Sequence, residues 1–125
     1  MIQHEDKTTK AKAEEKSHLI KRPVKTCKDG ATYHGEWNRS TNLKEGKGTM
    51  IYEDGVIIEG YWLKDMLHGR ARQIDRQGNI YIGQFRKNMR HGKGLLVYDC
   101  GDFYSGDFDR NEFYGRGISM FFGIK

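Results

Sequence analysis

Two histidines offer the strongest case for chemistry in this 125-residue chain. His68 and His91 stand 23 residues apart, each directly before a glycine, and two imidazoles at equivalent places resemble the beginning of a zinc site. No third ligand recurs at that spacing, and the corresponding places elsewhere hold Glu45 and Tyr114. We therefore expect both histidines to hydrogen-bond a turn, and we expect neither a metal nor any other cofactor.

Nucleophilic catalysis finds no better support. Cys27 and Cys100 lie 73 residues apart, without metal or redox spacing, which favours a reducing intracellular compartment. The four serines have no paired base in a recognisable motif. The Gly-x-Gly segments fall in predicted strands rather than before a helix, so they do not indicate a phosphate-binding loop. We expect no catalytic residue and no enzyme activity.

A basic band is the remaining polar candidate. Residues 66–98 carry net charge +6, whereas residues 29–65 carry −3 and residues 99–125 carry −2. The band consists of Arg70, Arg72, Arg76, Arg86, Lys87, Arg90 and Lys93. It is either a solvated face or a contact for an acidic protein segment or anionic lipid headgroups. With regular strands, Arg70, Arg72 and Arg76 project from the face opposite the glycines, whereas Arg86, Lys87 and Arg90 belong to a hairpin loop at the edge, so we expect the band to be split between a face and an edge. Nucleic acid is disfavoured, because residues 29–125 net only +1 and no aromatic stacking platform lies among these side chains.

The N-terminal residues 1–28 differ sharply from the rest. They carry eight basic and four acidic residues, with no glycine and no aromatic residue. We interpret them as a basic arm, partly helical over Asp6–Lys21 or solvated and frayed, that can order on an acidic partner. Residues 29–125 are the predicted folded part. No apolar run approaches the ~18 residues of a membrane span, and the N-terminus does not read as a signal peptide.

From Asp29 onward the chain repeats itself. All 16 glycines lie in this part, against a single proline in the whole chain. Four segments align: Tyr33-His-Gly35-Glu-Trp37, Ile58-Glu-Gly60-Tyr-Trp62, Tyr81-Ile-Gly83-Gln-Phe85 and Tyr104-Ser-Gly106-Asp-Phe108. Each is followed by a second Gly-containing motif (Gly46-Lys-Gly48, His68-Gly69-Arg-Ala71, His91-Gly92-Lys-Gly94, Tyr114-Gly115-Arg-Gly117) and preceded by an Xxx-Gly pair such as Asp54-Gly55 or Cys100-Gly101. A period in the low twenties, seen four times, predicts a repeat architecture.

One unit reads as a β-hairpin. Aromatic residues and glycine occupy every second position in Tyr81, Gly83 and Phe85, which is the spacing of a strand. The alternation begins again after a predicted six-residue loop, Arg86 to His91. The Xxx-Gly pairs then reverse the chain into the next unit. Glycines beside the rings allow aromatic side chains to lie flat over the backbone. The fold class predicted is all-β, a single-layer elongated antiparallel sheet of stacked hairpins.

These motifs resemble the MORN repeat (membrane occupation and recognition nexus). The resemblance covers residues 33 to about 123 in four copies, approximately 33–55, 58–78, 81–101 and 104–123. Ile58 replaces the leading aromatic of the second copy, and Gln73 stands where the other copies are apolar. The resemblance implies an interaction module without catalytic function of its own.

Apolar side chains fall on both predicted faces, more than a lone single-layer sheet should expose. A partner segment, with a helix as one option, is expected across the aromatic face. The partner-binding side chains predicted there are Tyr52, Tyr81, Leu96, Tyr98 and Tyr104, which we expect to stand away from the inner rings beside the glycines. Other proteins of a larger complex are the expected partners, and self-association is an alternative because the first and last strands are open.

Three functions remain open from the sequence. The first is a structural scaffold subunit of a cytoskeletal assembly, and the resemblance implies cilia or flagella, the axoneme included, as its place. The second is a module that binds anionic lipid or phosphoinositide at a membrane contact. The third is regulation of an enzyme through occupancy of the groove, which sequence does not separate from the first. The first is the reading we adopt, with weak lipid binding as its corollary.

Overall fold

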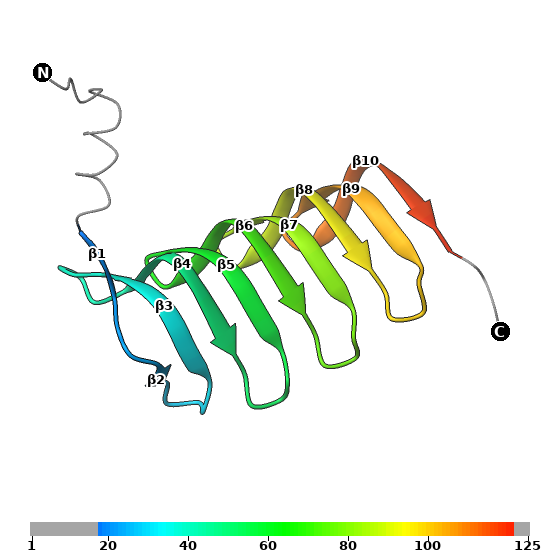
Figure 1. Ribbon diagram of the computed structural model, residues 1–125. Helices are drawn as coiled ribbons and strands as arrows, with labels where there is room; N and C mark the ends of the chain where they lie inside the picture. The colour runs from blue at the N-terminus through cyan, green and yellow to red at the C-terminus, as the bar shows by residue number, and fades with distance from the viewer. Residues whose placement is uncertain (1–17, 122–125) are drawn as a thin grey trace, which may run out of the picture.

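The computed structural model describes residues 18–121, and these residues form one open antiparallel β-sheet. Its strands lie side by side as a long ribbon (Figure 1), each paired with its sequence neighbour from β3 to β10. The strands are β1 (Leu19–Lys21), β2 (Lys25–Thr26), β3 (Thr32–Asn38), β4 (Lys44–Ile51), β5 (Ile57–Leu63), β6 (Met66–Ile74), β7 (Ile80–Arg86), β8 (Met89–Val97), β9 (Phe103–Asp109) and β10 (Glu112–Met120). The prediction of an all-β, single-layer sheet of stacked hairpins is confirmed.

The sheet begins earlier than Asp29, where the sequence analysis ends the arm. β1 and β2 both pair with β3, in the registers Ile20↔Trp37 and Lys25↔Tyr33. Pro23 lies in the short break between them, where the missing N–H of a proline would leave a gap in the ladder. The end of the arm is therefore an edge strand in two pieces. Most of the predicted helix Asp6–Lys21 lies outside the described residues, and its last three residues form β1.

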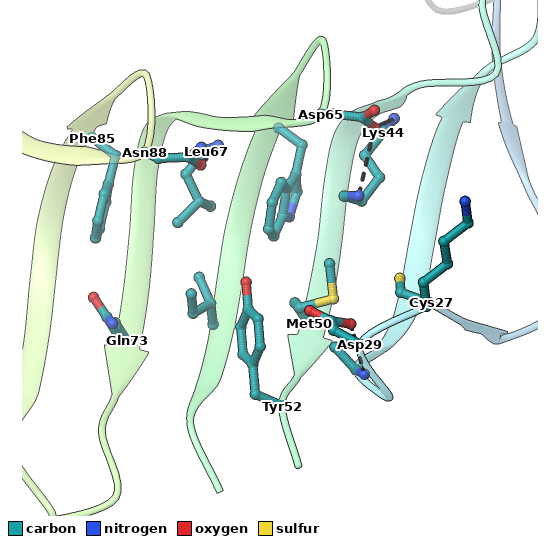
Figure 2. Close-up of a pocket in the computed structure, with 14 residues that line it drawn as sticks. Cys27, Asp29, Lys44, Met50, Tyr52, Asp65, Leu67, Gln73, Phe85 and Asn88 are labelled. Atoms are coloured by element: carbon teal, nitrogen blue, oxygen red, sulfur yellow. Dashed lines mark hydrogen bonds and ion pairs between the residues drawn. The ribbon is translucent and has the colours of Figure 1, made fainter. Parts of the chain in front are cut away.

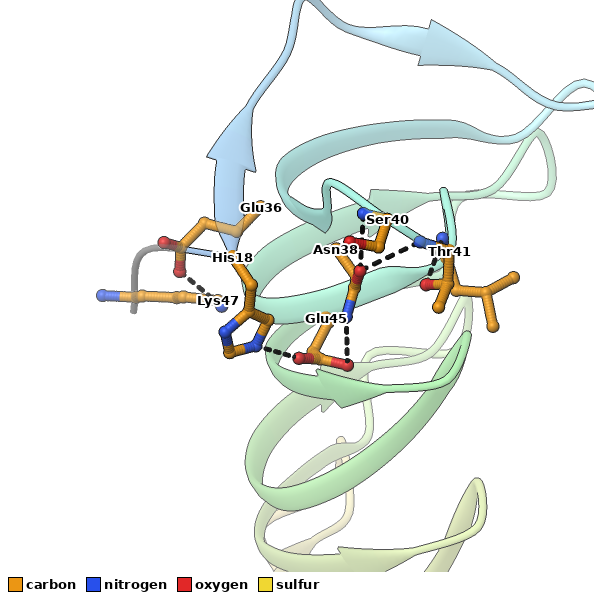
Figure 3. A network of polar contacts seen from close by, with 8 residues as sticks. His18, Glu36, Asn38, Ser40, Thr41, Glu45 and Lys47 are labelled. Carbon is orange, nitrogen blue, oxygen red and sulfur yellow. Dashed lines mark hydrogen bonds and ion pairs between the residues drawn. The ribbon is translucent and has the colours of Figure 1, made fainter. Parts of the chain in front are cut away.

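A polar network ties this first strand to the first hairpin (Figure 3). The His18 imidazole Nε2 lies 2.6 Å from Glu45 Oε2, while the Asn38 amide donates to Glu45 Oε1. Asn38 Oδ1 in turn accepts hydrogen bonds from the backbone N–H groups of Ser40 and Thr41, which shapes the β3–β4 loop. These contacts hold the residue before β1 against the first hairpin.

One edge of the ribbon is built from four matching five-residue turns, which we call the glycine-turn edge: residues 27–31, 52–56, 75–79 and 98–102. In each, the fourth residue is a glycine with positive φ, for example 97° at Gly55, that a side chain would strain. The Asp54 carboxylate accepts a hydrogen bond from Val56 N–H and so fixes the turn. The Xxx-Gly turns predicted from the sequence are confirmed.

The other edge joins the strands through residues 39–43, 64–65, 87–88 and 110–111. We call it the Asx-turn edge, because each of these connections contains an Asn or Asp residue. The predicted six-residue loop Arg86 to His91 is wrong, because only Lys87 and Asn88 separate β7 from β8. Both have positive φ (49° and 69°), as in a type I′ turn. Asn88 also accepts from Leu67 N–H at 2.8 Å and donates its own N–H to Leu67 O, so the turn clamps the preceding hairpin.

Each hairpin bends where its register shifts. Between Gly83↔Gly94 and Phe85↔Arg90, β8 contains two more residues than β7, and Gly92 in this bulge has φ of 75°. Equivalent shifts occur in the other three hairpins. Bulges bend strands and sharpen their twist. The strands therefore curl, and the side chains on the concave face point toward one another. We call this concave face the inner face.

The core lies entirely on the inner face. Its buried hydrophobic residues are Ala31, Tyr33, Trp37, Met50, Ile58, Trp62, Leu67, Ala71, Tyr81, Phe85, Leu96, Tyr104 and Phe108. The outer face carries a row of directly paired apolar residues, one per strand from β4 to β10: Ile51, Ile57, Ile74, Ile80, Val97, Phe103 and Met120. Apolar side chains on both faces, as predicted, are what a sheet without a second layer presents.

Tyrosine rings set the glycine pattern. A Cβ placed on Gly94 would collide with the ring of Tyr81, whose hydroxyl donates to Gln84 O at 2.8 Å. The same relation holds between Tyr33 and Gly48 and between Tyr104 and Gly117. The second hairpin has Ile58 instead of tyrosine, and there the facing residue is Ala71. The two replacements belong together, because the methyl group of alanine fits only where the ring is missing.

This pairing predicts a double-mutant cycle. Gly94→Ala should lower the free energy of unfolding by about 1–3 kcal/mol, because the added methyl group overpacks Tyr81. In a Tyr81→Ile background the same substitution should cost much less, as Ile58 and Ala71 coexist in the second hairpin. Urea denaturation of the four proteins measures the coupling. Additive effects would contradict the ring-over-glycine explanation.

Alkaline pH should also destabilise the sheet. Burial raises the pKa of Tyr81 to about 12 and raises that of Tyr33 still further, from an ordinary value of 10. Because the folded-state pKa lies above the unfolded one, stability is complete below pH 10 and falls as pH rises from 10 toward 12. Unfolding midpoints in urea from pH 8 to pH 11.5 should show this decline.

Tyr81→Phe is the matched control. It removes the hydroxyl bonded to Gln84 O and should cost about 1 kcal/mol at pH 7. Above pH 10 its stability should decline less than that of the unmodified chain, since one ionising group is gone. Parallel declines for the two proteins would show that Tyr81 is not responsible.

Candidate functional site

Aromatic clusters line most of the inner face. Tyr33 packs edge-on against Trp37 and Trp62, with centroids 5.0 and 5.6 Å apart. Tyr81 repeats the arrangement with Phe85 and Phe108, at 5.0 and 5.1 Å. In each case the tyrosine bridges the aromatic residue of its own hairpin and that of the next one. Edge-to-face pairs of this kind stabilise beyond the area they bury.

The row of rings is interrupted at the second hairpin. Ile58 occupies the tyrosine position there, and no ring joins Trp62 to Phe85. The shorter side chain leaves a groove of about 600 Å³ over Ile58 and Leu67. Its lining residues are Cys27, Lys28, Asp29, Ala31, Lys44, Met50, Tyr52, Ile58, Trp62, Asp65, Leu67, Gln73, Phe85 and Asn88.

Figure 2 shows that this groove has two walls. Phe85 and Leu67 point into it from the side of the Asx-turn edge, and Tyr52 rises toward them from the glycine-turn edge. Gln73 brings a half-buried amide into the second wall, at the place of Met50 and Leu96 in other hairpins. An apolar floor with an amide and charged groups at its rim is suited to a side chain that is mainly apolar.

Cations lie over the rings on either side of the gap. The ammonium group of Lys44 lies 5.6 Å from the Tyr33 ring centre and 5.8 Å from that of Trp62, and it pairs with Asp65 at 3.5 Å. The Arg90 guanidinium lies 5.7 Å from the ring centres of Tyr81 and Phe108. Such cation–π contacts stabilise the clusters and place positive charge on one wall.

Lys44 and Arg90 occupy equivalent positions of their hairpins; from the sequence, Arg90 is singled out only as part of the basic band and Lys44 not at all. Residues 44, 67, 90 and 113 are spaced 23 apart, and each faces the aromatic residue of its hairpin across the bulge. The second hairpin has Leu67 at this position. Leu67 and Ile58 therefore both stand where other hairpins have a longer side chain that fills the inner face. The equal spacing was the available signal.

The five predicted partner-binding residues divide into two groups. Tyr52 and Tyr98 are half-buried and pack against the core from the glycine-turn edge. Tyr81, Leu96 and Tyr104 are 2%, 8% and 7% exposed, and belong to the core itself. The expectation that all five stand away from the inner rings is wrong, because two of them are the rings that cover glycine. Contact between these residues and a partner stays a prediction.

Acidic groups lie close to the half-buried Tyr52. Burial raises the pKa of this phenol above its ordinary value, and the nearby charges of Asp29 and Asp54 raise it further. Asp29 also lines the groove, where its carboxylate accepts a hydrogen bond from Ala31 N–H. Lys28 lines the groove beside Asp29, so this wall carries charges of both signs.

The basic band is divided among several surfaces, as predicted, but Arg76 lies in a turn of the glycine-turn edge and Arg90 on the inner face, which was not predicted. Arg70 and Arg72 are exposed on the outer face, whereas Arg90 lies on the inner face over the rings. The remaining four are spread over the two turn edges and the outer face: Arg76, Arg86, Lys87 and Lys93. Lys93 pairs with Asp107 at 2.7 Å. These side chains are neighbours along the sequence, but the sheet distributes them among both faces and both edges.

The two histidines behave differently from the predicted turn hydrogen bonds: within residues 18–121, the His68 side chain is exposed and makes no hydrogen bond or ion pair, whereas His91 contacts an acid. His91 Nδ1 lies 3.5 Å from Asp109 Oδ1, a contact between neighbouring strands. Across residues 18–121, no three His, Cys, Asp or Glu side chains come together as metal ligands. Within the same range, no helix is long and apolar enough to cross a membrane.

The hairpins match a known repeat. The family model described as MORN repeat matches residues 33–57, 59–80 and 81–102, three consecutive units that together span more than half of the chain. No curated protein matches the chain. The matched units coincide with the hairpins β3–β4, β5–β6 and β7–β8 and the glycine turn that follows each. This chain therefore belongs to the MORN repeat family.

Proposed function

We propose that the chain is a non-enzymatic interaction protein that holds a segment of a partner protein in its inner groove. The observation that carries the proposal is the interruption of the ring row at Ile58, which leaves an apolar groove between two aromatic clusters. Aromatic walls around an apolar floor suit a buried anchor side chain of a protein partner. A repeat array of this family is an interaction or membrane-binding module, and the groove favours interaction.

The finer proposal is a scaffold subunit with four MORN repeats in a cytoskeletal assembly, with the cilium or flagellum and its axoneme as the location. The fourth hairpin supports the count, because Tyr104 donates to Asp107 O at 2.9 Å and covers Gly117 as its counterparts do. The location is what the resemblance to the MORN repeat implies. An elongated ribbon without a second layer offers its whole length to neighbouring subunits.

The second candidate, an anionic-lipid or phosphoinositide module, has one observation in its favour. Arg70 and Arg72 are exposed on the same outer face as the row that includes Ile57 and Ile74. Against it, Glu59 pairs in register with Arg72, and Arg90 lies on the opposite face. A bilayer needs its cations on one surface, so the division favours the protein partner.

Filling the groove should abolish partner binding without unfolding the chain. Ile58→Tyr combined with Ala71→Gly restores the tyrosine and the glycine of the other hairpins. We expect its free energy of unfolding to stay the same or rise by about 1 kcal/mol, since a buried ring outweighs the flexibility of glycine. In ciliated cells, the tagged variant should disappear from the detergent-extracted cytoskeletal fraction that retains the unmodified chain.

Ile57→Tyr is the matched control for this experiment. It makes the same change one residue away, on the outer face, where Ile57 is exposed. We expect it to fold and to remain in the cytoskeletal fraction. Full retention of the groove-filled double variant would show that the groove does not hold the partner.

Liposome binding separates the two candidates. We expect weak, salt-sensitive sedimentation with anionic vesicles and no preference among headgroups, because the basic side chains lie on different surfaces. The measurement compares phosphatidylserine and phosphoinositide vesicles at physiological salt. Tight binding to one phosphoinositide, lost when Arg70, Arg72 and Arg76 are changed to Gln, would favour the lipid module.

A further inference from the structure

The two edges of the ribbon carry opposite charges. The four turns of the glycine-turn edge contain six acids against two bases: Asp29, Glu53, Asp54, Asp75, Asp99 and Asp102 against Lys28 and Arg76. The turns of the Asx-turn edge contain four bases against one acid: Arg39, Lys64, Lys87 and Arg110 against Asp65. The two signs of charge are therefore separated across the width of the ribbon, whereas the charge bands seen in the sequence follow one another along its length.

Charged groups of both signs line the groove itself. Figure 2 shows Lys44 paired with Asp65 beside the Asx-turn edge and Asp29 on the opposite wall, and Lys28, next to Asp29 in the turn, also lines the groove. Arg90 adds a cation on the inner face of the third hairpin, 5.7 Å from the ring centre of Tyr81. The excess of cations on one flank of a segment lying along the groove, and of carboxylates on the other, therefore comes from Arg90 and from the turns of the two edges.

The spacing of the hairpins favours a helical segment. Neighbouring strands are ~4.8 Å apart, so equivalent positions of successive hairpins recur every ~9.6 Å along the groove. Seven residues of an α-helix rise ~10.5 Å and return to nearly the same side. An extended strand needs about three residues for that distance, which places the next side chain on the wrong face. A heptad helix therefore presents one apolar residue to each hairpin.

We propose that the groove binds an amphipathic helix of a protein partner whose apolar stripe is flanked by carboxylates on one side and by lysine or arginine on the other. The carboxylate flank lies along the Asx-turn edge, and the basic flank along the glycine-turn edge. A bulky apolar residue of the stripe fills the gap over Ile58. This inference rests on the groove function proposed above and adds to it the chemistry and the direction of the occupant.

Synthetic 21-residue helices provide the probe. All carry leucine at heptad positions a and d; the first has Glu at e and b with Lys at g and c, the second has Glu on both flanks, and the third has Lys on both. With the full chain, calorimetry should show the mixed-flank peptide binding about tenfold tighter than either uniform peptide. Attraction by net charge alone would instead favour the all-Glu peptide, because the chain carries +5. That ranking, or no binding by any peptide, overturns the proposal.

A fourth peptide with its flanks exchanged tests the direction. It should bind as tightly as the first but in the reverse orientation, since turning a helix end for end exchanges its flanks. A nitroxide at the peptide N-terminus should broaden amide signals of the first hairpin with one peptide and of the fourth hairpin with the other. The same orientation for both peptides overturns the proposal.

Two charge-reversed variants with equal net charge complete the test. Lys64→Glu with Lys87→Glu reverses exposed cations of the Asx-turn edge, and Arg70→Glu with Arg72→Glu makes the same change on the outer face. Only the first should abolish the preference for mixed flanks; an equal effect of both overturns the proposal. The groove function is judged separately by Ile58→Tyr with Ala71→Gly in cells, so either idea can fail while the other stands.

Discussion

The packing of a tyrosine ring on a bare backbone is the contact on which the rest of this sheet depends. Because residues 18–121 form one sheet without a second layer, the inner face builds its core from side chains that lie along the strands. Tyr81 does this by covering Gly94 and donating its hydroxyl to Gln84 O. The ring then reaches both Phe85 and Phe108, so a single residue joins two successive hairpins. Stability is consequently transmitted from neighbour to neighbour, as in other linear repeat arrays.

The departure from this rule creates the candidate site. Ile58 and Ala71 are mutually compatible, whereas a methyl group at the position of Ala71 would collide with the tyrosine that the other hairpins have in place of Ile58. The second hairpin therefore keeps its backbone geometry while giving up the ring that would fill its inner face. Trp62 remains anchored by its indole N–H, which donates to Gly48 O at 3.0 Å. The groove is thus a local loss of core between two complete clusters, without disorder of the hairpin that contains it.

The sequence predicts much of this architecture because glycine and aromatic residues report directly on backbone geometry. The period, the alternation around Gly83, and turns such as Asp54-Gly55 lead to stacked hairpins in the observed order. The short turns escaped prediction because Lys87 and Asn88 adopt positive φ without glycine. The start of the sheet escaped it because β1 and β2 are held by pairing with β3, a long-range contact that local composition does not reveal.

The site was harder to predict than the fold, for a related physical reason. Charges were grouped by position along the chain, whereas an antiparallel hairpin places residues close in sequence on opposite faces and edges. Arg86 and Arg90 are four residues apart, yet Arg86 ends a strand and Arg90 lies over the rings of two hairpins. What repeats every 23 residues falls on one edge or wall, and Asp65, Asn88 and Asn111 show this on the Asx-turn edge. Charge in such an array is therefore best compared at equivalent positions of successive hairpins, and that comparison reveals a groove between two turn edges of opposite charge.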